Sequence, residues 1–158
     1  MYRLVQLYLD QDRQNEALDL LIKALPIARR QLREDHPSTL CFVNSYAVFY
    51  TKQKQYNQAE KLFDEALKGR QRELGDDHPD TLESKNDLAV LYRMQARYDK
   101  AEPLLLEAVE GRRFKLGDEH PHTLESMNNL IDLYEAWGKP EKAEEWLAKL
   151  PLEQLKDK

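Results

Sequence analysis

The sequence repeats itself at a fixed interval of 42 residues. The dipeptide His-Pro begins at His36, at His78 and at His120, and single tyrosines and alanines recur with the same spacing. These are Tyr8, Tyr50, Tyr92 and Tyr134, and Ala17, Ala59, Ala101 and Ala143. A constant period in this range is typical of stacked supersecondary units, each of which buries its apolar face only against its neighbours.

Each period has the pattern of two helices. In the second unit, apolar residues with helical spacing predict one helix to about Lys52 and another from about Tyr56 to Glu73. Pro37 suits the first position of a helix, where its missing N–H would be unpaired anyway. Gly75 and Gly117 stand where a helix end requires a left-handed residue, and Arg33 occupies this position in the first unit, where we expect either slight strain or a different cap. Two further glycines, Gly69 and Gly111, fall inside second helices and favour close helix packing.

The predicted architecture is therefore all-α, an array of about four antiparallel helix pairs forming one domain over residues 1–158. The repeats span approximately 1–35, 36–77, 78–119 and 120–158, and the first is truncated. We expect that truncation to expose Leu4, Val5 and Leu7, because repeat arrays normally end in polar caps.

Composition excludes several classes of function. The net charge is −5, whereas a protein that neutralises nucleic-acid phosphates needs a basic face. Cys41 is the only cysteine, so neither an internal disulfide nor a multi-cysteine metal site is possible. The sequence contains no long apolar run and no leader pattern. We expect a soluble, cytoplasmic protein that binds neither nucleic acid nor membranes.

Catalytic, metal and cofactor sites are not predicted. The sequence contains no Gly-rich phosphate loop, no His-Glu-x-x-His and no nucleophile elbow. Packed helix axes lie 8–10 Å apart, so His36, His78 and His120 in successive units cannot share one ion. These histidines are interpreted as turn and cap residues, and the protein is expected not to be an enzyme.

The alternation of large and small residues resembles the tetratricopeptide repeat. It is carried by Leu88-Ala89-x-x-Tyr92, by Tyr98-x-x-Ala101 and by Leu105-x-x-Ala108. The common repeat has about 34 residues. The 42-residue form here, with Leu-Gly-Asp-Asp-His-Pro-Asp-Thr-Leu and Ala-Glu-Pro-Leu, is similar to the repeats of kinesin light chains. The resemblance implies a right-handed superhelical solenoid whose first helices line a concave groove.

On the tetratricopeptide register, Asn44, Asn86 and Asn128 occupy one groove-facing position in consecutive units. Asparagine is a poorer helix former than alanine, so its threefold occurrence in register needs a reason. An amide both donates and accepts, which suits the backbone of an extended peptide. Equally, these amides could tie adjacent helices together.

Arginines are the second group of candidate ligand-binding residues. Kinesin light chains hold acidic, tryptophan-containing peptides with basic and asparagine residues, and the resemblance carries this role to Asn86, Arg93, Arg112 and Asn128. Arg70 and Asn129 complete the candidate groove. The alternative for the arginines is pairing with neighbouring glutamates. The acidic residues Glu83, Glu125, Asp132 and Glu135 depart from the family pattern and disfavour a uniformly acidic ligand.

The sequence therefore predicts a non-enzymatic interaction scaffold that binds a peptide or protein segment in its concave groove. The set of basic residues that clamps a carboxylate in chaperone-binding relatives is absent, which disfavours chaperone tails. The alternative function is a structural module that forms homo-oligomers through its exposed terminal helices.

Overall fold

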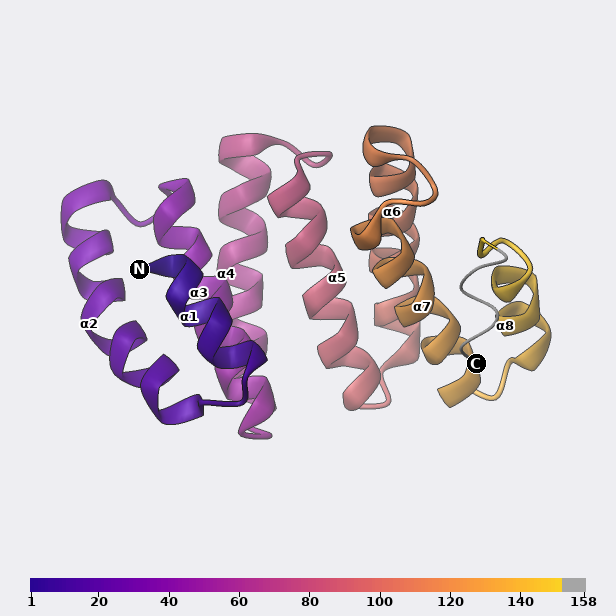
Figure 1. Ribbon diagram of the computed structural model, residues 1–158, viewed down its shortest axis with the longest axis horizontal. Coiled ribbons are helices and arrows are strands. Elements are labelled where there is room, and N and C mark those ends of the chain that lie inside the picture. Colours follow the sequence, from indigo (N-terminus) through magenta and orange to yellow (C-terminus); the bar gives the residue numbers. More distant parts are fainter. Residues whose placement is uncertain (152–158) are drawn as a thin grey trace. The chain divides into compact units, whose positions relative to one another are not determined.

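The computed structural model describes residues 1–151, and in that range the chain consists of eight α-helices without a β-strand (Figure 1). The helices are α1 (Tyr2–Asp10), α2 (Gln14–Leu32), α3 (Pro37–Lys52), α4 (Tyr56–Leu74), α5 (Pro79–Met94), α6 (Tyr98–Leu116), α7 (Pro121–Ala136) and α8 (Pro140–Leu147). None of the described helices is long and apolar enough to span a bilayer.

The His-Pro dipeptides start helices, as the sequence predicts. In each case the imidazole Nδ1 accepts a hydrogen bond from the backbone N–H two residues later. The distances are 3.1 Å for His36, 3.2 Å for His78 and 3.2 Å for His120. The proline that follows occupies the first helical position. The histidines thus satisfy orphan donors at helix starts, which confirms their interpretation as cap residues.

The helix ends also repeat. Gly75 and Gly117 have φ of 87° and 90° at the ends of α4 and α6, and Arg33 has φ of 84° at the end of α2. A second set of positive φ values closes the tight turn inside each hairpin, at Asp12, Lys54, Ala96 and Gly138. The sequence signals the first set through its glycines, but it gives no sign of the second, because only one of the four residues is glycine.

The chain divides into two compact units, Met1–Ser84 and the part from Lys85 onward, with the division inside α5. The prediction of a single domain over the whole chain stays a prediction. In the first unit, α3 packs against α4 and α2, and α1 packs against α2 and α3 (Figure 1). Its core contains Leu21, Leu25, Val43 and Phe49. Val5 is also buried there, so the expectation that it is exposed is wrong, because α1 turns this side chain toward α2 and α3.

In the second unit, α7 packs against α6 and α8. Leu105 of α6 and Leu130 and Ile131 of α7 are fully buried, and Trp146 of α8 is also buried. These positions follow the apolar stripes that the period predicts.

Gly69 permits a close approach of two helices in the first unit. A Cβ atom placed on this residue would lie 2.6 Å from Cδ2 and 2.8 Å from Cδ1 of the buried Leu40. Helix α3 therefore brings the Leu40 side chain so close to the backbone of α4 that a larger residue at position 69 would have to displace it. This confirms the packing interpretation of Gly69.

Candidate functional site

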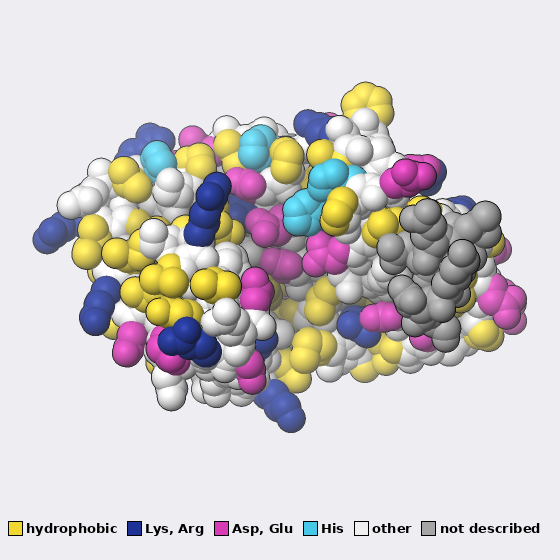
Figure 2. All heavy atoms as spheres, viewed as in Figure 1, with side chains coloured by type: hydrophobic (Ala, Val, Ile, Leu, Met, Phe, Trp, Pro, Cys, Tyr) yellow, Lys and Arg dark blue, Asp and Glu magenta, His cyan; other side chains and the backbone are white. Residues whose placement is uncertain are grey.

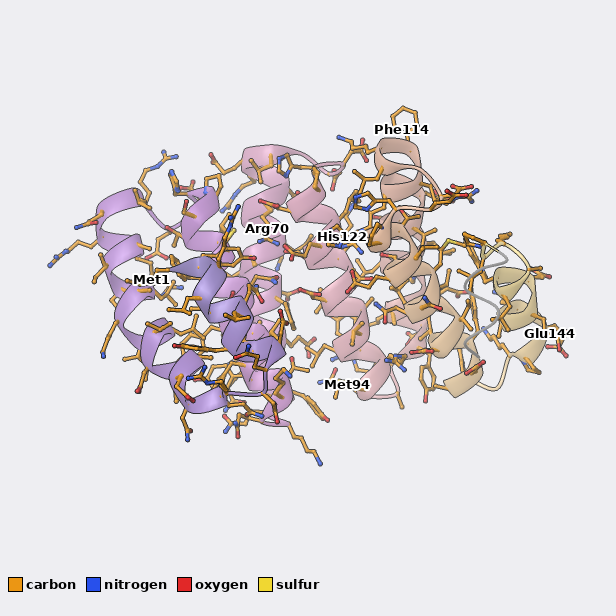
Figure 3. The ribbon with its side chains drawn as sticks, in the orientation of Figure 1. Met1, Arg70, Met94, Phe114, His122 and Glu144 are labelled. Atoms are coloured by element: carbon orange, nitrogen blue, oxygen red, sulfur yellow. The ribbon has the colours of Figure 1, made fainter. Side chains whose placement is uncertain are left out.

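Arg70 on α4 is fully buried in the first unit and bonds to the start of α5. Its Nη1 donates to the backbone oxygen of Asp80 at 2.7 Å, to Oγ of Ser84 at 2.8 Å and to Oε2 of Glu83 at 3.2 Å. Figure 3 shows this side chain on α4 directed toward the start of α5. The guanidinium thus joins two consecutive helices through a charged donor and three acceptors.

Arg112 makes the same arrangement in the second unit, 42 residues later. Its Nη1 donates to the backbone oxygen of His122 at 2.8 Å, to Oγ of Ser126 at 2.7 Å and to Oε2 of Glu125 at 3.3 Å. The side chain is 5% exposed. We call these two sets the polar junctions: Arg70, Glu83 and Ser84 in the first unit, and Arg112, Glu125 and Ser126 in the second.

The asparagines complete both polar junctions. The hydroxyl of Ser84 donates to Oδ1 of Asn44 at 3.3 Å, and that of Ser126 donates to Oδ1 of Asn86 at 3.0 Å. Nδ2 of Asn129 also donates to Oδ1 of Asn86, at 3.1 Å. Asn44 and Asn86 are both buried. The side-chain amides of Asn44 and Asn86 thus bond to neighbouring helices, as in the alternative that these asparagines tie adjacent helices together.

Charge and burial act in opposite directions at Arg70. Burial acts to lower the pKa of Arg70, but its acidic surroundings, with Glu83 foremost, outweigh it, so the net shift is upward and the guanidinium stays charged. Nη2 donates to Sγ of Cys41 at 3.5 Å. Burial raises the pKa of the Cys41 thiol although Arg70 opposes the shift, so this cysteine is a protonated packing residue.

The junction between the first two hairpins is built from apolar residues at the equivalent positions. Ala28 replaces the arginine and Phe42 replaces the serine, and both are buried. Tyr2 stands in the place of the asparagine, and its ring meets that of Phe42 edge-on, with centroids 6.2 Å apart. Equivalent junctions thus use two chemistries: a buried guanidinium with its hydrogen bonds in one case, and buried apolar side chains with an aromatic ring contact in the other.

The remaining candidates lie on α5 and α7 in the second unit. Nη1 of Arg93 is 3.5 Å from Oδ2 of Asp132. Nε of Arg93 and Oδ1 of Asn128 are buried atoms without a hydrogen-bond partner within the described chain. Asn129 is half-buried beside Asn86. We call the surface formed by Arg93, Asn128, Asn129 and Asp132 the α5–α7 face.

Carboxylates dominate the exposed part of this region. Glu125 and Asp132 are half exposed, and Glu135 lies at the exposed end of α7. Arg93, whose side chain is largely covered, already pairs with Asp132. The α5–α7 face therefore combines unpaired hydrogen-bonding atoms with an acidic border.

Sequence reasoning missed two groups that the structure brings to these sites. Ser84 and Ser126 bond both the arginine and the asparagine of each polar junction, and their 42-residue spacing was the available signal. Lys85 is buried with its Nζ 2.8 Å from Oε2 of Glu107, and no pattern in the sequence marks it. Among residues 1–151, no group of three or more His, Cys, Asp or Glu is arranged to hold a metal ion.

Comparisons with known proteins agree with this geometry. The model of the tetratricopeptide repeat family matches residues 38–113 and 96–150, and a second tetratricopeptide repeat model matches residues 1–38. Comparison with curated proteins finds no match.

Solved structures supply similar folds. TPR-like repeats of a Podospora anserina protein described as a putative kinesin light chain superimpose with a TM-score of 0.83 and 29% identity. They cover 94% of this chain and 70% of theirs, and a variant of the same repeats gives a TM-score of 0.82 with the same identity and coverage. BtubC (BKLC) from P. vanneervenii gives a TM-score of 0.80 and 26% identity over 92% of this chain and 58% of its own.

The repeated helix pairs, the 42-residue period and these matches establish an all-α helical repeat solenoid, a type of protein-interaction scaffold that is not enzymatic. The chain belongs to the tetratricopeptide repeat family, with repeats of the kinesin light chain-like type.

Proposed function

We propose that this chain binds an extended protein segment on the α5–α7 face. The observation that carries the proposal is that two of the five buried polar atoms without partners in the described chain, Nε of Arg93 and Oδ1 of Asn128, belong to this one face. An unsatisfied buried donor or acceptor costs about 1–3 kcal/mol, and native structures contain few of them. Both residues are partly exposed, and if their side chains turn outward a peptide backbone offers a carbonyl for Arg93 and an N–H for Asn128.

The surrounding charges select the ligand. Glu125, Asp132 and Glu135 favour a segment that carries lysine or arginine side chains, and they repel a uniformly acidic one. Arg93 already neutralises part of Asp132, so a ligand carboxylate has to displace an existing ion pair. A short segment held this way binds with micromolar affinity, about −8 kcal/mol.

The polar junctions have a separate role in this proposal. Arg70, Arg112, Asn44 and Asn86 direct their bonds to neighbouring helices, and their burial leaves them little surface for a ligand. They hold α5 and α7 in place, while Arg93, Asn128 and Asn129 meet the ligand. Substitutions in the polar junctions should therefore lower the stability of the fold, whereas substitutions of the ligand-contacting residues should lower the affinity for the ligand.

The test is a peptide array followed by calorimetric titration of the strongest binder. Arg93→Gln combined with Asn128→Ala should weaken binding at least tenfold with little change in the melting temperature, because Nε of Arg93 and Oδ1 of Asn128 are unpaired in the free chain and the partly exposed ion pair of Arg93 with Asp132 contributes little. The matched control is Arg30→Gln with Asn15→Ala, at exposed positions on α2. Equal affinity of both double variants, or a preference for uniformly acidic peptides, would refute the proposal.

A further inference from the structure

Helix α1 and the residue before it, Met1, expose three apolar side chains along one line. Met1 is 69% exposed, Leu4 40% and Leu7 47%, whereas Val5 and Leu9 on the same helix are buried. Residues three positions apart are neighbours on a helix surface, so the three side chains form a continuous stripe. Figure 2 shows hydrophobic side chains gathered over α1. We call Met1, Leu4 and Leu7 the α1 stripe.

The repeat itself indicates that such positions are normally covered by another helix. The equivalents of Leu7 are Phe49, Leu91 and Leu133, and all three are buried. Phe49 belongs to the core cluster that contains Leu21 and Leu25 of α2. A helix surface with the residue types of the α1 stripe is thus of the kind that packs against a second helix.

Two charged residues flank the α1 stripe on one side. Arg3 and Asp10 are both exposed and lie seven residues apart, which is two helical turns, so they share one flank of α1. Within the described residues, neither forms an ion pair. The helix therefore carries a positive charge near its start and a negative charge at its end, both beside an apolar line.

We propose that the α1 stripe is the contact surface for a second copy of this chain, with the two α1 helices antiparallel about a twofold axis. A twofold contact uses the same patch on both copies. Antiparallel packing brings like flanks together, which places Arg3 of each copy against Asp10 of the other. A parallel twofold arrangement would instead place the two charged flanks on opposite sides of the contact, so that Arg3 and Asp10 of the two copies would not meet. Charge complementarity therefore selects both the occupant and its direction.

The size of the surface limits the affinity. A nine-residue helix is about 13 Å long, so the contact is smaller than the interface of a standard stable complex. The dimer is accordingly weak, with a dissociation constant of about 10 μM to 1 mM. This association uses α1 and is separate from ligand binding on the α5–α7 face.

Sedimentation velocity of the full chain between about 5 and 500 μM tests the contact. The wild-type chain should shift from monomer to dimer over this range, and Leu4→Gln with Leu7→Gln should weaken the association at least tenfold. The control is Phe114→Gln, because Phe114 is 90% exposed at the end of α6, points away from its own helix (Figure 3) and lies outside the α1 stripe. A chain that remains monomeric, or association that persists in the double variant, overturns the proposal.

Exchange of the two charges tests the direction. Arg3→Glu and Asp10→Arg should each abolish self-association, because each gives both positions the same sign. An equimolar mixture of the two variants should form heterodimers at least as well as the wild-type chain dimerises, since every opposed pair is then of opposite sign. The doubly exchanged chain, Arg3→Glu with Asp10→Arg, should dimerise again. Failure of the mixture and of the double exchange to recover association overturns the antiparallel geometry.

Discussion

Arg33 and Gly75 adopt the same backbone conformation at equivalent helix ends. Arg33 has φ 84° and ψ 161° after α2, and Gly75 has φ 87° and ψ 166° after α4. The carbonyl oxygen of each accepts a 2.8 Å hydrogen bond from the threonine six residues later, Thr39 or Thr81. This region of backbone space is essentially restricted to glycine, so Arg33 holds strain that Gly75 avoids.

Replacement of Arg33 by glycine should therefore stabilise the protein. We expect Arg33→Gly to raise the free energy of unfolding by about 1–3 kcal/mol, because the strained residue is removed and the Thr39 bond is kept. The ion pairs that Arg33 makes with Asp35 and Glu73 at 3.6 and 3.8 Å are largely exposed and contribute little. Urea denaturation followed by circular dichroism measures the change. Arg30→Gly inside α2 is the control and should destabilise by about 1 kcal/mol; a loss of stability in Arg33→Gly would contradict the strain.

Arg70→Ala should be strongly destabilising. Removal of the guanidinium leaves the buried hydroxyl of Ser84 and the carbonyl of Asp80 without their common donor, and it also removes the partner of the partly exposed Glu83. Each buried polar group left unsatisfied costs about 1–3 kcal/mol, so we expect a loss of about 2–6 kcal/mol. Chemical denaturation of Arg70→Ala and of the equivalent Arg112→Ala measures both junctions. Arg30→Ala, at an exposed position, should change stability by less than about 0.5 kcal/mol, and an equally small effect of Arg70→Ala would show that the polar junction is dispensable.

Gly69 and Leu40 should be energetically coupled. Gly69→Ala adds a methyl group 2.6 Å from Leu40 Cδ2, and overpacking of this kind costs about 1–3 kcal/mol, which opposes the gain in helix propensity. Leu40→Ala alone should cost about 2–5 kcal/mol through the cavity it leaves. In the Leu40→Ala background, Gly69→Ala should become neutral or stabilising. A double-mutant cycle gives the coupling energy directly, and additive effects would mean that the helices move apart freely.

The carboxylate of Glu102 should stabilise the second unit in a pH-dependent way. The hydrogen bond from Lys142 at 2.7 Å, together with that from Tyr134 at 2.8 Å, lowers the pKa of Glu102 below its ordinary value near 4.5, against the effect of burial. A lowered pKa in the folded state means that the stabilisation is present above about pH 4.5 and is lost as the pH falls through the folded-state value.

Glu102→Gln should therefore be less stable than the wild-type chain at pH 7, with the difference shrinking below about pH 4 as the carboxylate takes up a proton. Thermal melts between pH 3 and 7 follow this dependence. The control is Glu141→Gln, at an exposed position on α8. A difference that persists unchanged at pH 3 would contradict the assigned hydrogen bonds.

The sequence by itself determined the helices, their order and the family. The 42-residue period, the His-Pro starts and the glycines at helix ends are local signals, because caps and left-handed residues act within one turn of the chain. The same signals located the strain at Arg33. They did not mark the turns at Asp12, Lys54 and Ala96, where non-glycine residues take positive φ because the packed helices on both sides require it.

Only the tertiary structure decided how the candidate residues are used. Asn44 and Asn86 have helix-tying contacts, and the unpaired atoms of Arg93 and Asn128 belong to the α5–α7 face; ligand binding there stays a prediction. The period predicts the positions of Arg70 and Arg93 on their helices. It does not predict how deeply each side chain is buried, because burial depends on which neighbouring helix covers a position. For the same reason Val5 is buried while Leu4 and Leu7, on the same short helix, remain exposed.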